Sequence, residues 1–195
     1  MNLAIFDFDG TISTKDSFVD FIVFAHGGLK ARLGFILLSP VLFLYLLKIL
    51  PGHQTKECFL TLFFHGWEEE RFRRKAEEYA NTALIHIIRQ QAREKIVWHK
   101  SQGHQVVVVS ASFEEYLRVW CERQHIDIIA TRAQFSNGKV TGALSTPNCY
   151  GVEKINRLKQ KYNLENFKYI YAYGDSNGDL PLKTIAHEFH YQLFQ

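Results

Sequence analysis

Leu3-Ala4-Ile5-Phe6-Asp7-Phe8-Asp9-Gly10-Thr11, close to the start of the 195-residue chain, is an apolar run that ends in two carboxylates and a glycine. A short apolar run closed by a turn signal is typical of a buried strand that feeds a loop. Gly10 and Thr11 shape a turn that presents both acids. We therefore expect a first strand that carries Asp7 and Asp9 at its end.

Further along the chain, strands and helices alternate. Four consecutive valines make Gln105 to Val109 the clearest strand. The other expected strands are 126–130 and 168–173, and the expected helices are 87–100, 113–124 and 152–162. Asn137-Gly138 predicts a hairpin turn between two short strands, because both residues accept positive φ angles. This alternation predicts an α/β fold, a Rossmann-like doubly wound parallel sheet covered by helices on both faces.

Residues 14 to 85 interrupt the alternation. They contain no convincing strand and read as several helices separated by Gly27-Gly28, Pro40 and Pro51-Gly52. We interpret them as a helical insert after the first strand. The predicted domains are an α/β core of residues 1–13 and 86–195 and a helical insert of residues 14–85.

Within the insert, residues 33–50 are nearly all apolar. As one helix they would extend about 27 Å, close to the ~30 Å of a bilayer core. A single span would, however, separate Asp7 from the later loops across the membrane. We therefore predict a buried or interfacial helical hairpin, and we leave open whether this segment is core or a membrane-facing surface.

Charge and composition exclude several classes of protein. The net charge is only +3, and the densest basic run, 71–75, directly follows the acidic run 68–70, which is typical of a solvated helix face. We expect no nucleic-acid partner. Three widely spaced cysteines predict neither a disulfide framework nor a zinc site. The first residues do not resemble a signal peptide, so we expect a cytoplasmic protein.

Polar residues that suit one reaction follow three of the expected strands. These residues are Asp7 and Asp9, then Ser110 with Ala111, and then Asp175 and Asp179; Lys154 opens a helix in between. Ligands of open parallel sheets bind at the carboxyl ends of the strands, so we expect these loops to meet. Four carboxylates in one pocket need a compensating cation, and an all-oxygen ligand set suits Mg²⁺.

A cation, an ammonium group and hydroxyl or backbone donors together make a phosphate site. A carboxylate in such a site can attack phosphorus and form an aspartyl-phosphate that water later cleaves. A second acid two residues on can protonate the leaving oxygen and then activate the water. The sequence therefore favours a phosphoryl-transfer enzyme.

The ordered set of motifs resembles the haloacid dehalogenase superfamily over the whole chain. Residues 6–11 match its first motif, Ser110 its second, Lys154 its third and residues 174–179 its fourth, with residues 14–85 in the place of a helical cap. The resemblance implies that Asp7 is the nucleophile and Asp9 the general acid/base. It further implies that Thr11 stabilises the loop and that the phosphate is bound by Ser110, Ala111 and Lys154. The implied ligands of Mg²⁺ are Asp7, Asp175 and the carbonyl of Asp9, and Asp179 supports the metal site or binds the metal directly.

The chain resembles most the branch of this superfamily that contains phosphoserine phosphatase. Two departures stand out: Gly178 replaces an asparagine of the fourth motif, whose contact Asn177 could supply, and Asp16 replaces a substrate-reading glutamate. The cap is similar to that of the phosphatidylglycerophosphatase C family, which has an aromatic-rich helix followed by an apolar run around a proline.

The resemblance implies a phosphomonoester hydrolase with a phospholipid head-group phosphate as substrate and with peripheral contact between the cap and the inner membrane surface. Three alternatives stay open: a phosphatase for a small soluble phosphate such as phosphoserine, a phosphotransferase of the same chemistry, and a non-catalytic binding module. The complete set of motif residues argues against the last of these.

Overall fold

A five-stranded parallel sheet organises the computed structural model, which describes residues 1–194. The strand order is β3-β2-β1-β6-β7, and every neighbouring pair is parallel. The strands are β1 (Asn2–Phe6), β2 (Gln105–Phe113), β3 (Asp127–Thr131), β6 (Tyr169–Gly174) and β7 (Glu188–Tyr191). The predicted α/β sheet is confirmed, and the first expected strand, with its two acids beyond its end, lies at the centre.

Alternate residues of the central strands face opposite sides of this sheet. Ala4 and Phe6 of β1 belong to one buried apolar cluster, whereas Leu3 and Ile5 belong to another. The four valines of β2 divide between the two clusters in the same way. Both faces are therefore buried, which explains why these strands are continuous apolar runs rather than alternating ones.

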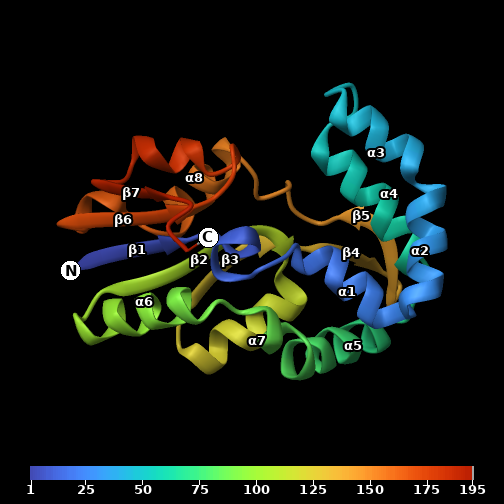
Figure 1. Cartoon of the computed structure of the whole chain (residues 1–195), viewed down its shortest axis with the longest axis horizontal. Coiled ribbons are helices and arrows are strands. Elements are labelled where there is room, and N and C mark those ends of the chain that lie inside the picture. The colour runs from blue at the N-terminus through green and yellow to red at the C-terminus, as the bar shows by residue number, and fades with distance from the viewer. Residues whose placement is uncertain (195) are drawn as a thin grey trace.

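Helices cover both faces. The helices of the core are α6 (Gln90–Ser101), α7 (Glu114–Gln124) and α8 (Val152–Lys161), with short helical turns at Leu84–Ile87, Leu164–Asn166 and Leu180–Thr184. Figure 1 shows α6 and α7 on one side of the sheet and α8 on the other. Trp120 of α7 packs in the first cluster and Leu158 of α8 in the second, so the sheet is doubly wound as predicted.

Five helices form the cap that follows β1. They are α1 (Ser17–His26), α2 (Gly28–Leu37), α3 (Ser39–Leu46), α4 (Gly52–Phe64) and α5 (Glu69–Thr82). The chain leaves and re-enters the core through two adjacent segments, since Ser13 bridges to Ile88 and the amide of Arg89 donates to the carbonyl of Ile12 at 2.8 Å. A helical cap inserted after the first strand is confirmed.

A short hairpin extends from the core to the cap. It consists of β4 (Ala133–Ser136) and β5 (Lys139–Leu144), joined by Asn137 and Gly138 with φ angles of 49° and 71°, as the sequence predicts. Val140 exchanges backbone hydrogen bonds with the turn between α4 and α5, accepting from Gly66 and donating to Trp67, both at 2.9 Å. The hairpin therefore ties the cap to the segment between β3 and α8.

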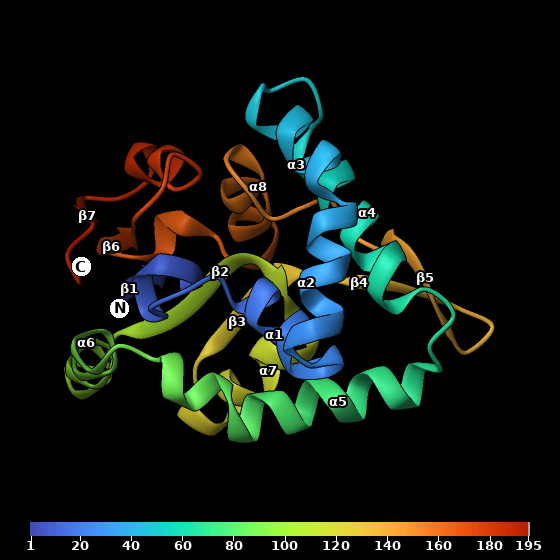
Figure 2. The same cartoon turned by 45° about the vertical axis from the view of Figure 1, so that its right-hand side comes forward.

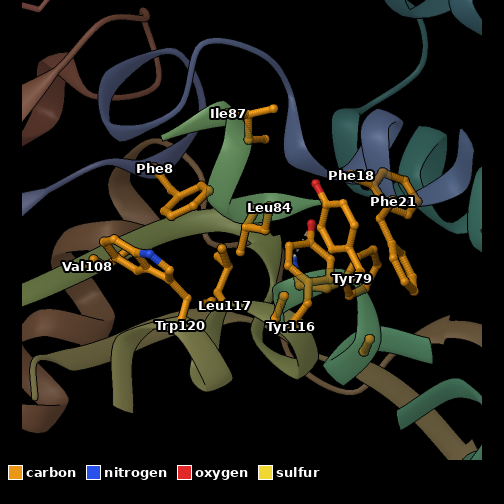
Figure 3. Packing of buried hydrophobic residues seen from close by; sticks show 14 of the residues in the cluster. Phe8, Phe18, Phe21, Tyr79, Leu84, Ile87, Val108, Tyr116, Leu117 and Trp120 are labelled. Carbon is orange, nitrogen blue, oxygen red and sulfur yellow. Dashed lines mark hydrogen bonds between the residues drawn. The ribbon is translucent and has the colours of Figure 1, made fainter. Parts of the chain in front are cut away.

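Aromatic side chains join the cap to the core. Figure 3 shows Phe18, Phe21, Tyr79 and Tyr116 gathered at the junction of α1, α5 and α7. The ring of Phe21, which is fully buried, lies 5.3 Å from that of Tyr79 and 5.2 Å from that of Tyr116. Some phenylalanines of the insert, such as Phe18 and Phe21, therefore belong to the buried core of the cap.

The apolar segment 33–50 was predicted to be a helical hairpin, either buried or interfacial, and the structure departs from the hairpin and from the first of these two environments. Its helices α2 and α3 meet at a bend of 57° and do not fold back on each other; α3 instead packs beside α4. No residue of α3 is buried, and α2 buries only Ala31. Of the two alternatives left open, burial is the one that fails, because within residues 1–194 no second layer of chain covers the outer face of either helix (Figure 2).

One strand was not predicted. Glu188-Phe189-His190-Tyr191 forms β7 at the edge of the sheet, although it has no apolar run and only four residues. The ring of His190 stacks on that of Tyr173 with the ring centroids 4.7 Å apart. Pairing with β6 alone decides the conformation of such a short segment, and a single-chain pattern does not reveal it.

Candidate active site

The predicted site residues meet at the carboxyl ends of β1 and β6. Asp7 directly follows β1, and its amide donates to the carbonyl of Tyr173 at 2.9 Å. Asp175 directly follows β6, and Asp179 lies one turn further along the same loop. Parallel neighbouring strands end at the same edge of a sheet, which brings residues 168 positions apart in sequence into one site.

Lys154 lies between two of these carboxylates. Its Nζ donates to Oδ1 of Asp7 and to Oδ1 of Asp179, each at 2.5 Å, and the lysine is almost fully buried. Burial alone would lower the pKa of this ammonium, but the charges of Asp7 and Asp179 raise it above its ordinary value. Lys154 is therefore a fixed cation, although it lies within α8 and is remote in sequence from both partners.

The oxygens of Asp7, Asp175 and Asp179 form a candidate metal site. One oxygen from each residue lies within 4.8 Å of the other two. Burial raises the pKa of Asp7 well above its ordinary value, against the opposing charge of Lys154, and burial together with Asp179 raises that of Asp175. These raised pKa values indicate that one lysine does not fully compensate the cluster, and a divalent cation with oxygen ligands would fit it.

Asp179 organises the loop in which it lies. Its Oδ2 accepts from the amide and hydroxyl of Ser176, at 3.0 and 2.8 Å, and from the amide of Asp175 at 3.2 Å. Burial would raise the pKa of Asp179, but the charge and hydrogen bond of Lys154 and the donors of Ser176 hold it below its ordinary value. Because one oxygen of Asp179 accepts from the loop and the other from Lys154, this residue fixes the positions of the loop and of the lysine.

The turn after Asp7 leaves room for only a glycine. Gly10 has a φ angle of +80°, and a Cβ there would lie 2.2 Å from Oδ2 of Asp175. Thr11 donates from its hydroxyl to Oδ1 of Asp175 at 3.2 Å. The glycine and threonine that follow the two acids therefore bring the first loop against the last one.

Asp9 faces the cap rather than the carboxylate cluster. Its Oδ1 accepts from the amide of Ser17 at 2.7 Å, and its Oδ2 accepts from the hydroxyl of Ser112. Burial and then the nearby charge of Asp16 raise the pKa of Asp9 to about 6, against the donors of Ser112 and Ser17. A carboxyl group with such a pKa can both give and take a proton near neutral pH.

Ser110 and Ala111 lie at the end of the regular part of β2. Ser110 is fully buried, and its hydroxyl accepts from the amide of Ser112 at 3.0 Å. Ala111 lines the central cavity, whereas Ser110 does not. The strand continues past its predicted end to Phe113 with a register shift, which places Ser112 beside Asp9. Ser112 was expected among the polar residues that end this strand, in Ser110-Ala111-Ser112, but no role was assigned to it from the sequence.

The cap contributes Asp16 and Lys56. Asp16 caps α1, since its Oδ1 accepts from the amides of Phe18 and Val19 at 2.9 Å each, and it lines the cavity. Lys56 of α4 donates to the carbonyl of Ala111 and to Oδ1 of Asn148, the latter at 3.2 Å. Burial lowers the pKa of Lys56, against the charges of Asp16 and Asp9. Sequence analysis missed Lys56 because a lone lysine on a helix usually faces solvent.

The departure at Gly178 has a local explanation. A Cβ on Gly178 would lie 2.2 Å from the ring of Tyr150, so this aromatic side chain occupies the space that a larger residue needs. Asn177 is exposed and does not line the cavity, whereas Tyr150 and Ser176 do. Tyr150, rather than a neighbouring amide, therefore fills this corner.

Most of these groups, among them Asp7, Asp9, Lys154 and Asp175, border one cavity of about 960 Å³ between the core and the cap. The acidic loops and Lys154 line one side of it. The cap lines the other side with apolar residues, namely Phe18, Val19, Leu42, Tyr45 and Phe59, and with polar or charged ones, namely Lys15, Asp16, His53, Thr55, Lys56 and Glu57. The volume is at the upper end for small-molecule sites, and the two sides suit a ligand that has an anionic group and an apolar remainder.

Comparison with known sequences agrees with this geometry. The sequence profile of the family described as haloacid dehalogenase-like hydrolase matches residues 4–183. The chain is 29% identical to protein CicA of Caulobacter vibrioides over 99% of its own length and 86% of that protein. It is 32% identical to a protein of Mycobacterium tuberculosis named "Probable phosphatase", over 94% of its own length and 66% of that protein.

Solved structures show the same fold. A protein with unknown function from Bordetella pertussis Tohama I superposes with a TM-score of 0.83 at 22% identity, over 96% of this chain and 88% of that one. A substrate-bound phosphoserine phosphatase superposes with a TM-score of 0.71 at 20% identity, over 97% of this chain and 85% of that one. At these identities the likeness concerns the architecture alone.

Proposed function

The chain belongs to the haloacid dehalogenase-like hydrolases, and on that premise we propose that it is a Mg²⁺-dependent phosphomonoesterase that takes the phosphoryl group onto Asp7. The observation that carries this proposal is the cluster of Asp7, Asp175 and Asp179 around the buried Lys154, beside a cavity that a separately held acid, Asp9, also lines. This arrangement supports phosphoryl transfer, in which positioning and charge compensation do most of the work.

In the proposed reaction, Lys154 and the loop amides orient the phosphate, and Oδ of Asp7 attacks phosphorus in line with the leaving oxygen. Asp9, protonated, gives its proton to that oxygen, and then takes a proton from the water that cleaves the aspartyl-phosphate. The raised pKa of Asp9 favours this double role. Mg²⁺, when bound by Asp7, Asp175 and the carbonyl of Asp9, would supply positive charge against the phosphoryl oxygens.

The test is the rate of phosphate release from an aryl phosphate by Asp7→Asn. We expect activity to fall to background, a loss on the order of 10⁴-fold, because an amide cannot act as the nucleophile. Asp20→Asn is the matched control: Asp20 lies in the cap, pairs with Lys15 at 2.9 Å and does not line the cavity, so activity should persist. Full turnover by Asp7→Asn would refute the proposal.

We further propose that the substrate carries its phosphate on a phospholipid head group. The apolar part of the cap lining, which includes Phe18, Leu42 and Phe59, supports a substrate with a large apolar portion. A small soluble phosphate such as phosphoserine would leave most of 960 Å³ unfilled. The experiment compares kcat/KM for a phospholipid with a terminal phosphate and for phosphoserine. A higher value for phosphoserine would contradict the lipid assignment and leave the phosphatase assignment intact.

A further inference from the structure

The cap carries an exposed apolar surface that nothing else in the described chain covers. We call residues 28–50, that is α2, α3 and the turn after them, the apolar arm. Figures 1 and 2 both show α3 and its following turn projecting from the rest of the molecule. Six large apolar side chains of the arm are between 60% and 74% exposed: Leu33, Ile36, Leu37, Phe43, Leu46 and Ile49.

Such a surface is unusual for a helix in water. α3 has the sequence Ser-Pro-Val-Leu-Phe-Leu-Tyr-Leu, so it has no polar face after its first turn, and none of its residues is buried. A helix that is apolar all round is normally buried in a core or in a membrane. Large contiguous apolar patches on proteins mark surfaces that bind a partner or a membrane.

The charges around the arm identify the partner. Lys30, Arg32 and Lys48 flank its apolar residues and are exposed. Between Asp20 and Glu57 the chain has no acidic residue at all. Lysine is depleted at protein–protein interfaces, whereas basic residues beside an apolar surface are attracted to anionic lipid head groups. Long basic side chains can also keep their charge at the head-group level while their stems lie among apolar groups.

The shape of the arm restricts how deeply it can enter a bilayer. Within residues 1–194 no single helix is long and apolar enough to cross a membrane, and the pair α2 and α3, which together have the required length and composition, is bent by 57°. α4 returns beside α3 to the same core. Both ends of the arm therefore stay on one side, and the arm lies in the interface.

The arm is also continuous with the catalytic cavity. Leu42 and Tyr45 of α3 line the cavity, while Phe43 and Leu46 of the same helix face away from it into solvent. A surface that binds the outer face of α3 would therefore lie next to the cavity wall formed by its inner face. This adjacency relates the arm to the supply of substrate.

We propose that the apolar arm docks the enzyme on an anionic lipid bilayer, with α3 inserted among the head groups and the cavity held beside the lipid surface. The inference deepens the proposed function, because it gives the route by which a phospholipid reaches Asp7. The docking itself depends only on the arm. Its test is therefore separate from the test of catalysis.

The test is co-sedimentation with vesicles, made in the Asp7→Asn background so that no lipid is consumed. We expect binding to vesicles of phosphatidylcholine with phosphatidylglycerol, and much weaker binding to phosphatidylcholine alone. The double variant Phe43→Ser/Leu46→Ser should bind at least tenfold more weakly, and Lys30→Gln/Lys48→Gln about fivefold more weakly for each charge removed. When the two double variants are made in a chain that keeps Asp7, they should hydrolyse a soluble aryl phosphate at the normal rate, because neither changes a residue that lines the cavity.

Val97→Ser is the matched control, since Val97 is an exposed valine on α6, far from the arm in sequence, and it should not affect binding. Equal binding by the arm variants and the parent protein would overturn the proposal, and so would equal binding to neutral and anionic vesicles. A dimer in solution that the Phe43→Ser/Leu46→Ser change dissociates, without vesicle binding by the parent, would show that a second copy covers the arm and would also overturn it.

Discussion

The carboxylate cluster and the apolar arm lie on opposite sides of one cavity. Charged side chains are usually exposed and apolar side chains usually buried, and each of these two regions departs from one half of this rule. Asp7 and Asp179 are charged groups held out of water, whereas Phe43 and Leu46 are apolar groups held in it. The cluster finds its compensation inside the chain, from Lys154 and the loop donors. The apolar side chains of the arm are not covered by other residues within 1–194. The difference indicates that the cluster acts on a ligand drawn into the protein, and that the arm acts on something outside it.

The largest expected effect concerns the acid beside the cluster. Asp9→Asn should slow turnover of an aryl phosphate by about 10²- to 10⁴-fold, because neither the leaving oxygen nor the attacking water then has a proton partner. The phosphoenzyme should accumulate when its hydrolysis is slowed more than its formation, and intact mass spectrometry would detect the added phosphoryl group. Normal turnover would refute the role of Asp9 and weaken the contrast between a reactive cluster and a docking arm.

Compensation within the cluster is tested by Lys154→Met. The change leaves Asp7 and Asp179 buried without their common partner, and we expect the free energy of unfolding to fall by about 3–5 kcal/mol in the absence of divalent cations. Mg²⁺ should restore part of this loss. Urea unfolding measures both effects. Lys159→Met, on the exposed side of the same helix, is the control and should change the stability by less than about 0.5 kcal/mol.

A pair of phenylalanines distinguishes cap core from arm. Phe21→Ala removes a fully buried ring that packs on Tyr79 and Tyr116, and should lower the free energy of unfolding by about 3 kcal/mol or more. Phe43→Ala removes a ring that is 61% exposed and should change it by no more than about 0.5 kcal/mol. Thermal or urea unfolding gives both values. Similar losses for the two variants would mean that the arm is packed after all.

The smallest expected effect concerns a buried group that lacks an opposite charge. His99 is fully buried, and its ring nitrogens lie 2.8 Å from Nδ1 of His104 and 2.9 Å from the hydroxyl of Tyr173. Burial first, and then His104, lower the pKa of His99 to about 3. Below pH 6.5 the unfolded chain therefore takes up a proton that the folded chain does not, and stability falls as the pH falls from 6.5 towards 3.

This linkage predicts a loss of about 1.6 kcal/mol between pH 6.5 and pH 5, because the slope rises from about half to nearly all of the ~1.4 kcal/mol per pH unit of a single proton across this interval. The measurement is urea unfolding at several pH values in this interval. His99→Gln should make the free energy of unfolding depend less steeply on pH. His86→Gln, which changes an exposed histidine, should leave this dependence unchanged. Equal slopes in all three proteins would show that His99 takes up its proton in the folded state.

Several features were predictable because they depend on local sequence. The run Leu3 to Phe6 and the four valines of β2 are buried on both faces, and such strands appear as uninterrupted apolar runs. Asn137-Gly138 permits only a narrow set of turns, so the hairpin was predictable as well. By contrast, β7 depends on pairing with β6, and no local pattern indicates it.

The site divides in the same way. Asp7, Asp9, Asp175 and Lys154 could be identified because each follows a strand or opens a helix in a fixed order along the chain. The role of Lys56 could not, because its partner Ala111 lies 55 residues away and the contact depends on how the cap rests on the core. The contact of Ser112 with Asp9 joins two parts of the core that lie 103 residues apart, and it depends on the pairing of β1 with β2.

The sequence by itself determined the sheet, the place of the cap and which acids follow the central strands, because residue type and spacing along one strand or helix decide burial and turn geometry. Only the tertiary structure decided that Lys154 joins Asp7 to Asp179, that Tyr150 takes the space beside Gly178, and that the apolar arm is exposed. The sequence does not distinguish a leucine in a core from a leucine on an exposed surface. Whether other parts of the chain pack over the leucine decides its burial.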